Sequence, residues 1–327
     1  MLFKQLINSF LIIFISLATG YLIQLLVKKS ILSLPFPLDK ARKFLQKLAI
    51  LFFVPITYIG VYWTMDFHQI KLLLFPLLGI LNLILGGTIA ILIAGRIHLD
   101  NKDTGSFFCC GFFSNLVNIG GLICFLFLGE EGYKLVPLYT LLTQITYYAI
   151  GFSIAKYYSM KDKQQNKNSF DLKAMLKDTF ILVGLASIII GLSFNASRLV
   201  RPAVYTTIIS LFIPVSTILL LVSIGLSMRL NKVRQYQKES ILIAGIKFLI
   251  VPAVMVSIGF LLGFHQINDG LPLKVILILS SAPVAFHSLI PPSLYGLNLD
   301  LANSCWLFTT FGLILLIPIL LFLINLI

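Results

Sequence analysis

Charged residues are scarce in this 327-residue chain, which is 58% hydrophobic and only 11% charged. Soluble domains carry about 25% charged residues, so this chain has too few charges to cover a water-exposed surface. The mean hydropathy of +0.99 and the 27 phenylalanines instead suit helices that face lipid. The composition excludes an ordinary soluble enzyme and a disordered protein, and it predicts an all-α polytopic membrane protein.

Cysteine is also rare, and the four cysteines lie in apolar runs without a CxxC pair: Cys109, Cys110, Cys124 and Cys305. We interpret them as small core residues rather than metal ligands or disulfide partners. The motifs GxSxG and HExxH and the phosphate loop are absent from the sequence. We therefore expect no enzyme, no metal site and no cofactor.

Acidic residues are missing from the middle of the apolar runs, because all 12 Asp and Glu fall in loops or at the ends of runs. Proton-driven carriers often use a carboxylate within the membrane. Coupling in this chain would need His287, a proton carried by the substrate, or a cation held by Asn, Ser and carbonyl oxygens. Movement driven by the membrane potential alone is a further alternative, so proton and sodium coupling both stay open.

Long apolar runs are numerous, and a bilayer-spanning helix needs about 20 apolar residues. Ten runs are candidates: 5–27, 43–64, 72–95, 105–128, 134–157, 174–194, 203–228, 240–264, 273–295 and 301–326. The first run is longer than the apolar part of a signal peptide. A polar stretch at 158–173 would link a first half (residues 1–157) to a second half (residues 174–327).

The net charge of +13, from 25 Lys and Arg against 12 Asp and Glu, fits cationic cytoplasmic loops better than nucleic-acid binding. With ten spans, 18 basic residues fall on one side and 6 on the other, and Lys247 lies within a span. The side with 18 should be cytoplasmic, which places both termini outside the cytoplasm. We expect a multi-pass protein of the inner (cytoplasmic) membrane with no nucleic-acid partner.

The two halves carry signs of an internal repeat. Gly79–Ile84 aligns with Gly245–Ile250 at four of six positions, and polar residues interrupt the fourth and ninth spans at nearly the same offset. Five spans per half is an odd number, so the halves would insert with opposite orientations. Inverted repeats of this kind are typical of secondary transporters, in which paired broken helices mark the binding site.

The fourth span has polar residues in mid-membrane: Ser114, Asn115 and Asn118, followed by Gly120 and Gly121. Amide side chains at this depth are costly without a partner or a cavity. A glycine pair lets a helix unwind and free its backbone groups. We predict a broken helix that lines a site; a helix-packing interface of small residues is the alternative.

The ninth span has Ser281, Pro283, His287 and Ser288 near its middle. Pro283 has no amide hydrogen, which predicts a break, although a plain kink would give the same pattern. His287 would be either a hydrogen-bonded interior residue or a proton-coupling or substrate-binding group. Half-helix N-termini that meet at two such breaks would favour a carboxylate, whereas the carbonyl ends of the other halves would favour a cation.

Two further spans supply candidate site residues. Lys247, in the eighth span, would either snorkel to the membrane surface or balance the charge of an anionic substrate. Gln144 and Tyr147 lie on one helical face of the fifth span. They would line the same cavity or pack at an interface.

Several short motifs lie in or next to these spans: Ser114–Gly121 (SNLVNIGG), Leu128–Gly132 (LGEEG), Gly245–Lys247 (GIK), Val251–Pro252, Ser281–Pro283 (SAP), Tyr295–Gly296 and Asp300–Asn303 (DLAN). Together they resemble the corresponding segments of the auxin efflux carrier family. The resemblance extends over the whole chain in the number of spans, the position of the linker and the placement of the termini.

The resemblance implies ten transmembrane helices in two inverted five-helix repeats, with broken crossover helices 4 and 9. Helices 1, 2, 6 and 7 would form a scaffold domain, and helices 3–5 and 8–10 a transport domain. Asn115 and Pro283 match the polar residue and the proline of the two crossovers. Leu122 stands where the family carries a proline, so Gly120 and Gly121 would have to permit the first break. The short linker suits a bacterial-type member.

We therefore predict a secondary active transporter that moves a small organic anion, such as malate or an auxin-like acid, by elevator-like alternating access. Asn115, Asn118 and Ser281 would bind its carboxylate, while Lys247 and His287 would tune the charge of the site. A sodium-coupled symporter of the bile-acid type and a non-transporting sensor or partner subunit are the alternatives. The substrate and membrane lipids would be its partners, and a homodimer is compatible with the sequence.

Overall fold

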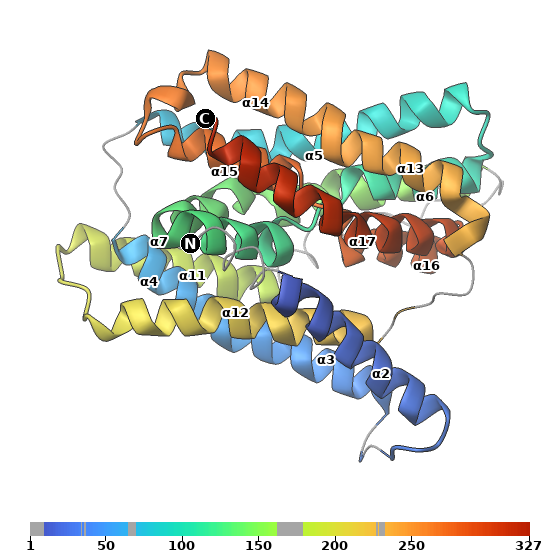
Figure 1. Cartoon of the computed structure of the whole chain (residues 1–327), viewed down its shortest axis with the longest axis horizontal. Helices are drawn as coiled ribbons and strands as arrows, with labels where there is room; N and C mark the ends of the chain where they lie inside the picture. Colours follow the sequence, from blue (N-terminus) through green and yellow to red (C-terminus); the bar gives the residue numbers. More distant parts are fainter. Residues whose placement is uncertain are drawn as a thin grey trace. The chain divides into compact units, whose positions relative to one another are not determined.

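The computed structural model describes residues 10–33, 35, 37–64, 70–161, 179–226, 228 and 233–327 (Figure 1). The regular secondary structure of these residues is helical throughout, and no strand occurs among them. The predicted all-α class is therefore confirmed for this part of the chain. The predicted linker lies outside the described residues from residue 162 onward.

The helices follow one another closely along the chain. In the first half they are η1 (Leu11–Ile15), α2 (Ser16–Lys28), α3 (Leu38–Leu48), η2 (Ala49–Phe53), α4 (Val54–Trp63), η3 (Ile70–Leu74), α5 (Phe75–Arg96), α6 (Asn101–Phe112), η4 (Leu116–Gly120), α7 (Gly121–Thr140), α8 (Thr143–Thr146), η5 (Tyr147–Phe152) and α9 (Ser153–Lys161). In the second half they are α11 (Thr179–Ala196), α12 (Val204–Gly225), η6 (Val233–Tyr236), α13 (Gln237–Gly245), η7 (Ile246–Ile250), α14 (Val251–Leu261), η8 (Phe264–Gln266), α15 (Leu271–Ser280), η9 (Phe286–Leu289), α16 (Ile290–Tyr295) and α17 (Leu299–Ile324).

Seven helical runs in the described part of the chain are long and apolar enough to cross a membrane: Leu11–Lys28, Lys40–Trp63, Lys71–Arg96, Leu116–Lys161, Val204–Gly225, Arg234–Leu261 and Leu299–Ile324. The fourth run has 46 residues, enough for more than one crossing at about 20 residues each. The chain is thus a multi-pass membrane protein. The ten-span count and the inverted repeat stay predictions.

The chain folds into two compact units. The first unit comprises Met1–Ile70, Gly121–Pro137 and Leu176–Met228. In it, α11 packs against α4, and α12 packs against α2, α3 and α4. Gly20 and Gly225 permit the close crossing of α2 and α12, because a Cβ at Gly20 would lie 2.2 Å from the carbonyl oxygen of Val222.

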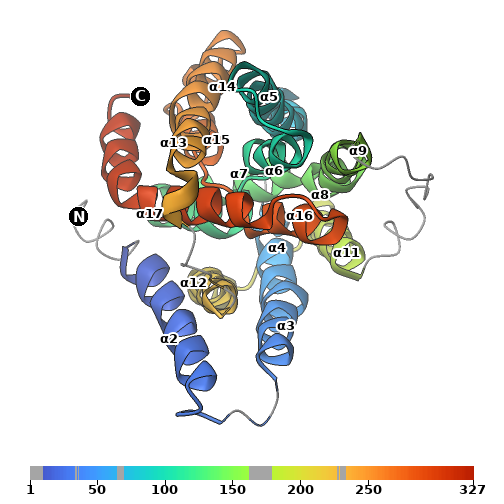
Figure 2. The same ribbon diagram turned by 90° about the vertical axis from the view of Figure 1, so that its right-hand side faces the viewer.

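The second unit comprises Lys71–Gly120, Leu138–Met175 and Arg229–Ile327. Here α5 packs against α6, α13 against α17, and α14 against α15 and α5 (Figure 2). Both interrupted spans begin in this unit, as α6 and as α15. The division into these two units leaves the predicted scaffold and transport domains as predictions.

Polar caps fix the starts of α6 and α17, ahead of the membrane-spanning part of each helix. Asp100 Oδ1 accepts a 2.7 Å hydrogen bond from the Asp103 amide, and Asn298 Nδ2 donates to Asp103 Oδ1 at 2.7 Å. Burial raises the pKa of the Asp103 carboxyl; the Asn298 hydrogen bond lowers it, and the charges of Asp100 and Glu239 raise it further. These bonds tie the start of α6 to the start of α17.

Candidate functional site

Two spans of the second unit are interrupted, and both interruptions have an extended backbone. Helix α6 ends at Phe112 and η4 begins at Leu116, while α15 ends at Ser280 and η9 begins at Phe286. Pro283 lies in the second interruption, as predicted. The position predicted for the first break was wrong, because Gly120 is helical, with φ −59° and ψ −47°. The chain opens several residues earlier, at Phe113–Asn115.

The two extended segments pair with each other. The Asn115 amide donates to the Pro283 carbonyl oxygen at 2.9 Å, and the Ala285 amide donates to the Phe113 carbonyl oxygen at 3.1 Å. Ser114 and Val284 face each other in this antiparallel bridge. The missing helical hydrogen bonds of one break are thus replaced by those of the other, as a low-dielectric environment requires. A carbonyl end and an amide end of a helix adjoin each break.

Lys247 reaches the first break from η7. Its side chain is 1% exposed, and its Nζ donates a 2.6 Å hydrogen bond to Ser114 Oγ. The snorkelling alternative is therefore wrong, because the ammonium turns into the unit instead of toward the membrane surface. No carboxylate among the described residues forms an ion pair with it. The break accordingly places the buried Lys247 amine next to the Ser114 hydroxyl, just before η4 begins.

Two glycines make room for this arrangement. A Cβ at Gly86 of α5 would lie 2.3 Å from the carbonyl oxygen of Gly111 and 3.6 Å from Lys247 Nζ. A Cβ at Gly111 of α6 would in turn lie 2.5 Å from the carbonyl oxygen of Gly86. The absence of side chains at both positions lets α5 and α6 touch through their backbones beside the ammonium group.

Tyr147 braces the backbone of the first break. Its hydroxyl donates to the Ser114 carbonyl oxygen at 2.8 Å and accepts from the Ser114 amide at 3.4 Å. Its ring lies 4.7 Å from the Phe113 ring and 6.2 Å from the His287 ring, between centroids. The structure therefore brings Tyr147, Ser114 and Lys247 together. The His287 side chain is accessible and lies at the edge of this aromatic group.

The other predicted site residues differ in their environments. The Asn115 side chain caps η4 by accepting a 3.4 Å bond from the Ile119 amide. Asn118 is half-buried on η4, and Gln144 is exposed, so Gln144 does not share the buried position of Tyr147. Three of the remaining residues are buried beside the breaks: Gly120, which packs on Leu279 of α15, and Ser281 and Ser288. Gly121 is buried as the first residue of α7.

Two buried polar residues of this unit were not predicted from the sequence. Asn82 of α5 is 1% exposed, and neither polar atom of its side chain has a hydrogen-bond partner among the described residues. It lies one turn before Gly86 on the same helical face. Thr309 of α17 accepts from the Val284 amide through Oγ1 at 3.2 Å. A lone amide in the otherwise apolar third span was the available signal for Asn82.

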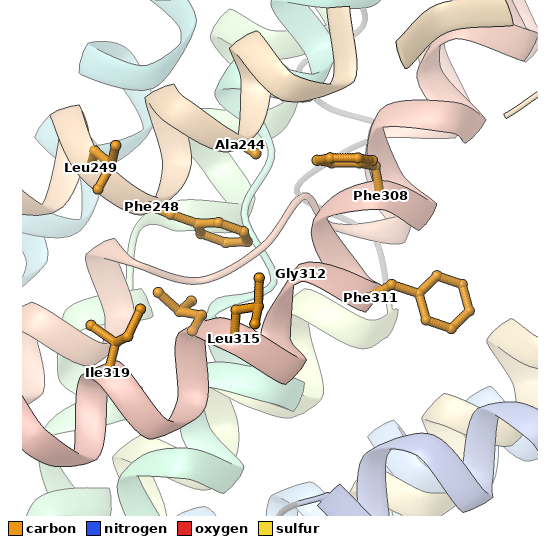
Figure 3. A pocket seen from close by; sticks show the side chains of 9 residues that line it. Ala244, Phe248, Leu249, Phe308, Phe311, Gly312, Leu315 and Ile319 are labelled. Atoms are coloured by element: carbon orange, nitrogen blue, oxygen red, sulfur yellow. The ribbon is translucent and has the colours of Figure 1, made fainter. Parts of the chain in front are cut away.

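An apolar pocket of about 370 Å³ lies elsewhere in the same unit, between Ala244, Phe248 and Leu249 on one side and Phe308–Ile319 of α17 on the other (Figure 3). Its labelled side chains are all hydrocarbon, so it offers nothing to bind a charged group. The described residues also contain no group of three or more His, Cys, Asp and Glu that could hold a metal. The paired breaks are therefore the candidate site, and their chemistry suits an anion.

Comparison with known proteins identifies the family of the chain. A family model described as membrane transport protein matches residues 5–324. The chain belongs to this membrane transport protein family. It is also 23% identical over 239 residues to an uncharacterized transporter of Methanothermobacter thermautotrophicus, covering 73% of this chain and 74% of that protein. The family indicated by the motifs is thus confirmed, and the chain is a membrane transporter.

Proposed function

We propose that this transporter is a secondary carrier of a small organic anion and that the paired breaks bind the substrate's carboxylate. The observation that carries the proposal is the Lys247 ammonium, which is buried against Ser114 and has no described carboxylate partner. A buried charge is costly unless it is paired. An anionic substrate would supply the missing negative charge at the place where η4 and η9 begin.

The expected binding mode follows from these groups. The carboxylate would accept from amides at the start of η4, near Asn118, and from the Ser281 hydroxyl, with Lys247 supplying the positive charge and the Asn115 and Asn118 side chains supplying further donors. Pro283 and the extended segment Phe113–Asn115 would shape the backbone around it. Elevator-like alternating access would move helices 3–5 and 8–10 against a scaffold of helices 1, 2, 6 and 7. The carrier would lie in the cytoplasmic membrane with both termini outside.

A sodium-coupled symporter is the second candidate, because Asn and Ser oxygens and carbonyl ends at the breaks could hold a cation. The Lys247 ammonium disfavours it, since a fixed positive charge repels a second cation at close range. A non-transporting sensor is the third candidate. It would bind an acid without moving it, so flux separates it from the other two.

Flux in proteoliposomes is the test. The purified carrier is screened electrically against a panel of mono- and dicarboxylates and amino acids, with and without sodium and a pH gradient. Carboxylate flux should occur without sodium and should be lost in Lys247→Met and Asn115→Ala. Sodium dependence would favour the symporter, and acid binding without flux would favour the sensor.

Lys102→Met is the matched control, because Lys102 is an exposed lysine outside the breaks. It should leave flux unchanged. The size of the loss in Lys247→Met can be estimated. A unit charge about 6 Å away in a medium of dielectric constant about 20 contributes about 3 kcal/mol, so the KM should rise about 100-fold. Equal flux in both methionine variants would contradict the anion site.

A further inference from the structure

The run Lys40–Trp63 is longer than the membrane is thick. It contains 24 residues in α3, η2 and α4, which at 1.5 Å per residue is about 36 Å. The hydrocarbon core of a bilayer is about 30 Å thick. Part of this helix therefore lies in a head-group layer, and the position of Trp63 decides which part.

Trp63 marks one membrane boundary. Its Nε1 donates to the Leu199 carbonyl oxygen at 2.8 Å, and its ring lies 5.5 Å from that of Tyr205, between centroids. Trp and Tyr gather at membrane interfaces, where one end of the ring is apolar and the other polar. About 30 Å of helix counted back from Trp63 corresponds to about 20 residues, which reaches Lys43 at the opposite boundary.

Three lysines form one stripe at this opposite boundary: Lys40, Lys43 and Lys47. They are three and four residues apart, so they lie on one helical face, and all three are exposed. Lys40 then lies in the head-group layer, while Lys47 lies about 6 Å below Lys43, within snorkelling reach. None of them has an ion-pair partner among the described side chains.

The rest of α3 fits an interfacial position. Its apolar residues Leu38, Ala41, Leu45 and Leu48 are half-buried on the face away from the lysines, and α3 packs against α12 of the same unit. Phe44, next to Lys43, is 59% exposed at the depth where acyl chains begin. A cationic stripe above an exposed aromatic ring matches a phosphate head group with its acyl chains below.

We propose that Lys40, Lys43 and Lys47 form a binding site for the phosphate head group of an anionic phospholipid. The phosphate would lie between Lys40 and Lys43, Lys47 would snorkel up to it, and the acyl chains would pass Phe44. A lipid is favoured over a soluble phosphate because Lys47 and Phe44 lie at hydrocarbon depth. The site is independent of the substrate site, which lies in the other unit.

The test compares two triple variants of the full-length carrier. Lys40→Gln/Lys43→Gln/Lys47→Gln removes the stripe, and Lys102→Gln/Lys161→Gln/Lys238→Gln removes three other exposed lysines. Both are placed in nanodiscs of phosphatidylcholine with or without phosphatidylglycerol, and bound phosphatidylglycerol is counted by native mass spectrometry. Each lysine of the stripe contributes about fivefold to the affinity for the lipid bound there, so the stripe variant should bind about 100-fold more weakly. The control lysines lie on three different helices, α6, α9 and α13, and form no stripe, so the control variant should bind within about threefold of the unmodified protein.

Two further measurements distinguish a lipid site from a general charge effect and from a site for soluble phosphate. The corresponding triple Arg variant keeps the charge and should bind phosphatidylglycerol like the unmodified protein. Inorganic phosphate added to phosphatidylcholine nanodiscs should not protect the carrier against heat. Equal loss in both Gln triples would mean a general charge effect, and protection by phosphate alone would mean a soluble ligand; either outcome overturns the proposal. If the Gln triple fails to fold, the single variant Lys43→Gln should show the fivefold loss.

Discussion

Gly86 offers the sharpest test of the arrangement around Lys247. In Gly86→Ala, the new Cβ would lie 2.3 Å from the carbonyl oxygen of Gly111. A carbon and a carbonyl oxygen normally stay more than about 3 Å apart, so α5 and α6 must separate by roughly 1 Å. The oxygen belongs to the backbone and cannot swing aside. Overpacking of this kind costs about 1–3 kcal/mol.

Gly95 provides the matched control on the same helix. A Cβ at Gly95 would meet no atom within 4 Å, so Gly95→Ala should only gain helix propensity, about 0.5–1 kcal/mol. The two substitutions are chemically identical and should have opposite signs. The gain in helix propensity is common to both, so their free energies of unfolding should differ by the overpacking cost of about 1–3 kcal/mol, which favours Gly95→Ala.

Thermal unfolding in detergent and flux in proteoliposomes measure the two consequences. A difference of 1 kcal/mol shifts the midpoint by about 2–4 °C in proteins of 150–250 residues, so the variants should differ by several degrees. Flux should fall in Gly86→Ala, because the shift of α5 disturbs the contact with Lys247 Nζ. Equal midpoints and equal flux in the two variants would refute the close approach of the helices beside the ammonium group.

Three other substitutions test neighbouring parts of the structure. Tyr147→Phe leaves the Ser114 amide without its described acceptor, so it should lower the stability by about 1–2 kcal/mol and slow flux. Tyr157→Phe, at an exposed ring, should change neither. Identical melting curves for the two variants would show that the Tyr147 hydroxyl does not stabilise the break. Pro283→Ala should slow transport more than it lowers the melting temperature, and an unchanged rate would reduce the proline to a passive kink. The pKa of Asp103 is raised in the folded protein, so ionisation of this carboxyl destabilises the fold as the pH rises through that pKa. The variant Asp103→Asn should therefore have a higher melting temperature than the unmodified protein at pH 7 and the same melting temperature near pH 4. A difference in melting temperature that does not change with pH would show that ionisation is not the cause.

Membrane class, family and the second break could be predicted because each depends on local chemistry. Low charge and long apolar runs suffice for a multi-pass protein, and Pro283 lacks the amide hydrogen that the helical ladder needs. The first break was placed incorrectly because glycine only permits an extended backbone, whereas the pairing partner fixes its position. Phe113–Asn115 is extended because Pro283 and Ala285 pair with it, and this long-range pairing leaves no local signal in the fourth span.

Lys247 shows the same limit for side chains. Its position seven residues into a span allowed both snorkelling and an inward orientation. The outcome depends on Ser114, which is far away in sequence and accepts the hydrogen bond of the ammonium group. Gln144 shows the converse, since it shares a helical face with Tyr147 in the sequence pattern but is exposed in the fold. The periodicity of the sequence shows which residues share a helical face, but the packing of the neighbouring helices determines whether each residue on that face is buried.

The pairing of the two breaks also explains how a carrier can be stable with its site empty. Backbone groups at the crossing are satisfied within the protein: Asn115 and Ala285 by the opposite segment, Val284 by Thr309, and Ser114 by Tyr147. The substrate is therefore not needed to complete the fold. The Lys247 ammonium is the exception, because its hydrogen bond within the described part of the chain goes to a neutral hydroxyl, that of Ser114. Under the proposed function, an anionic substrate would gain affinity there without being needed for folding, as a carrier that must release its substrate requires.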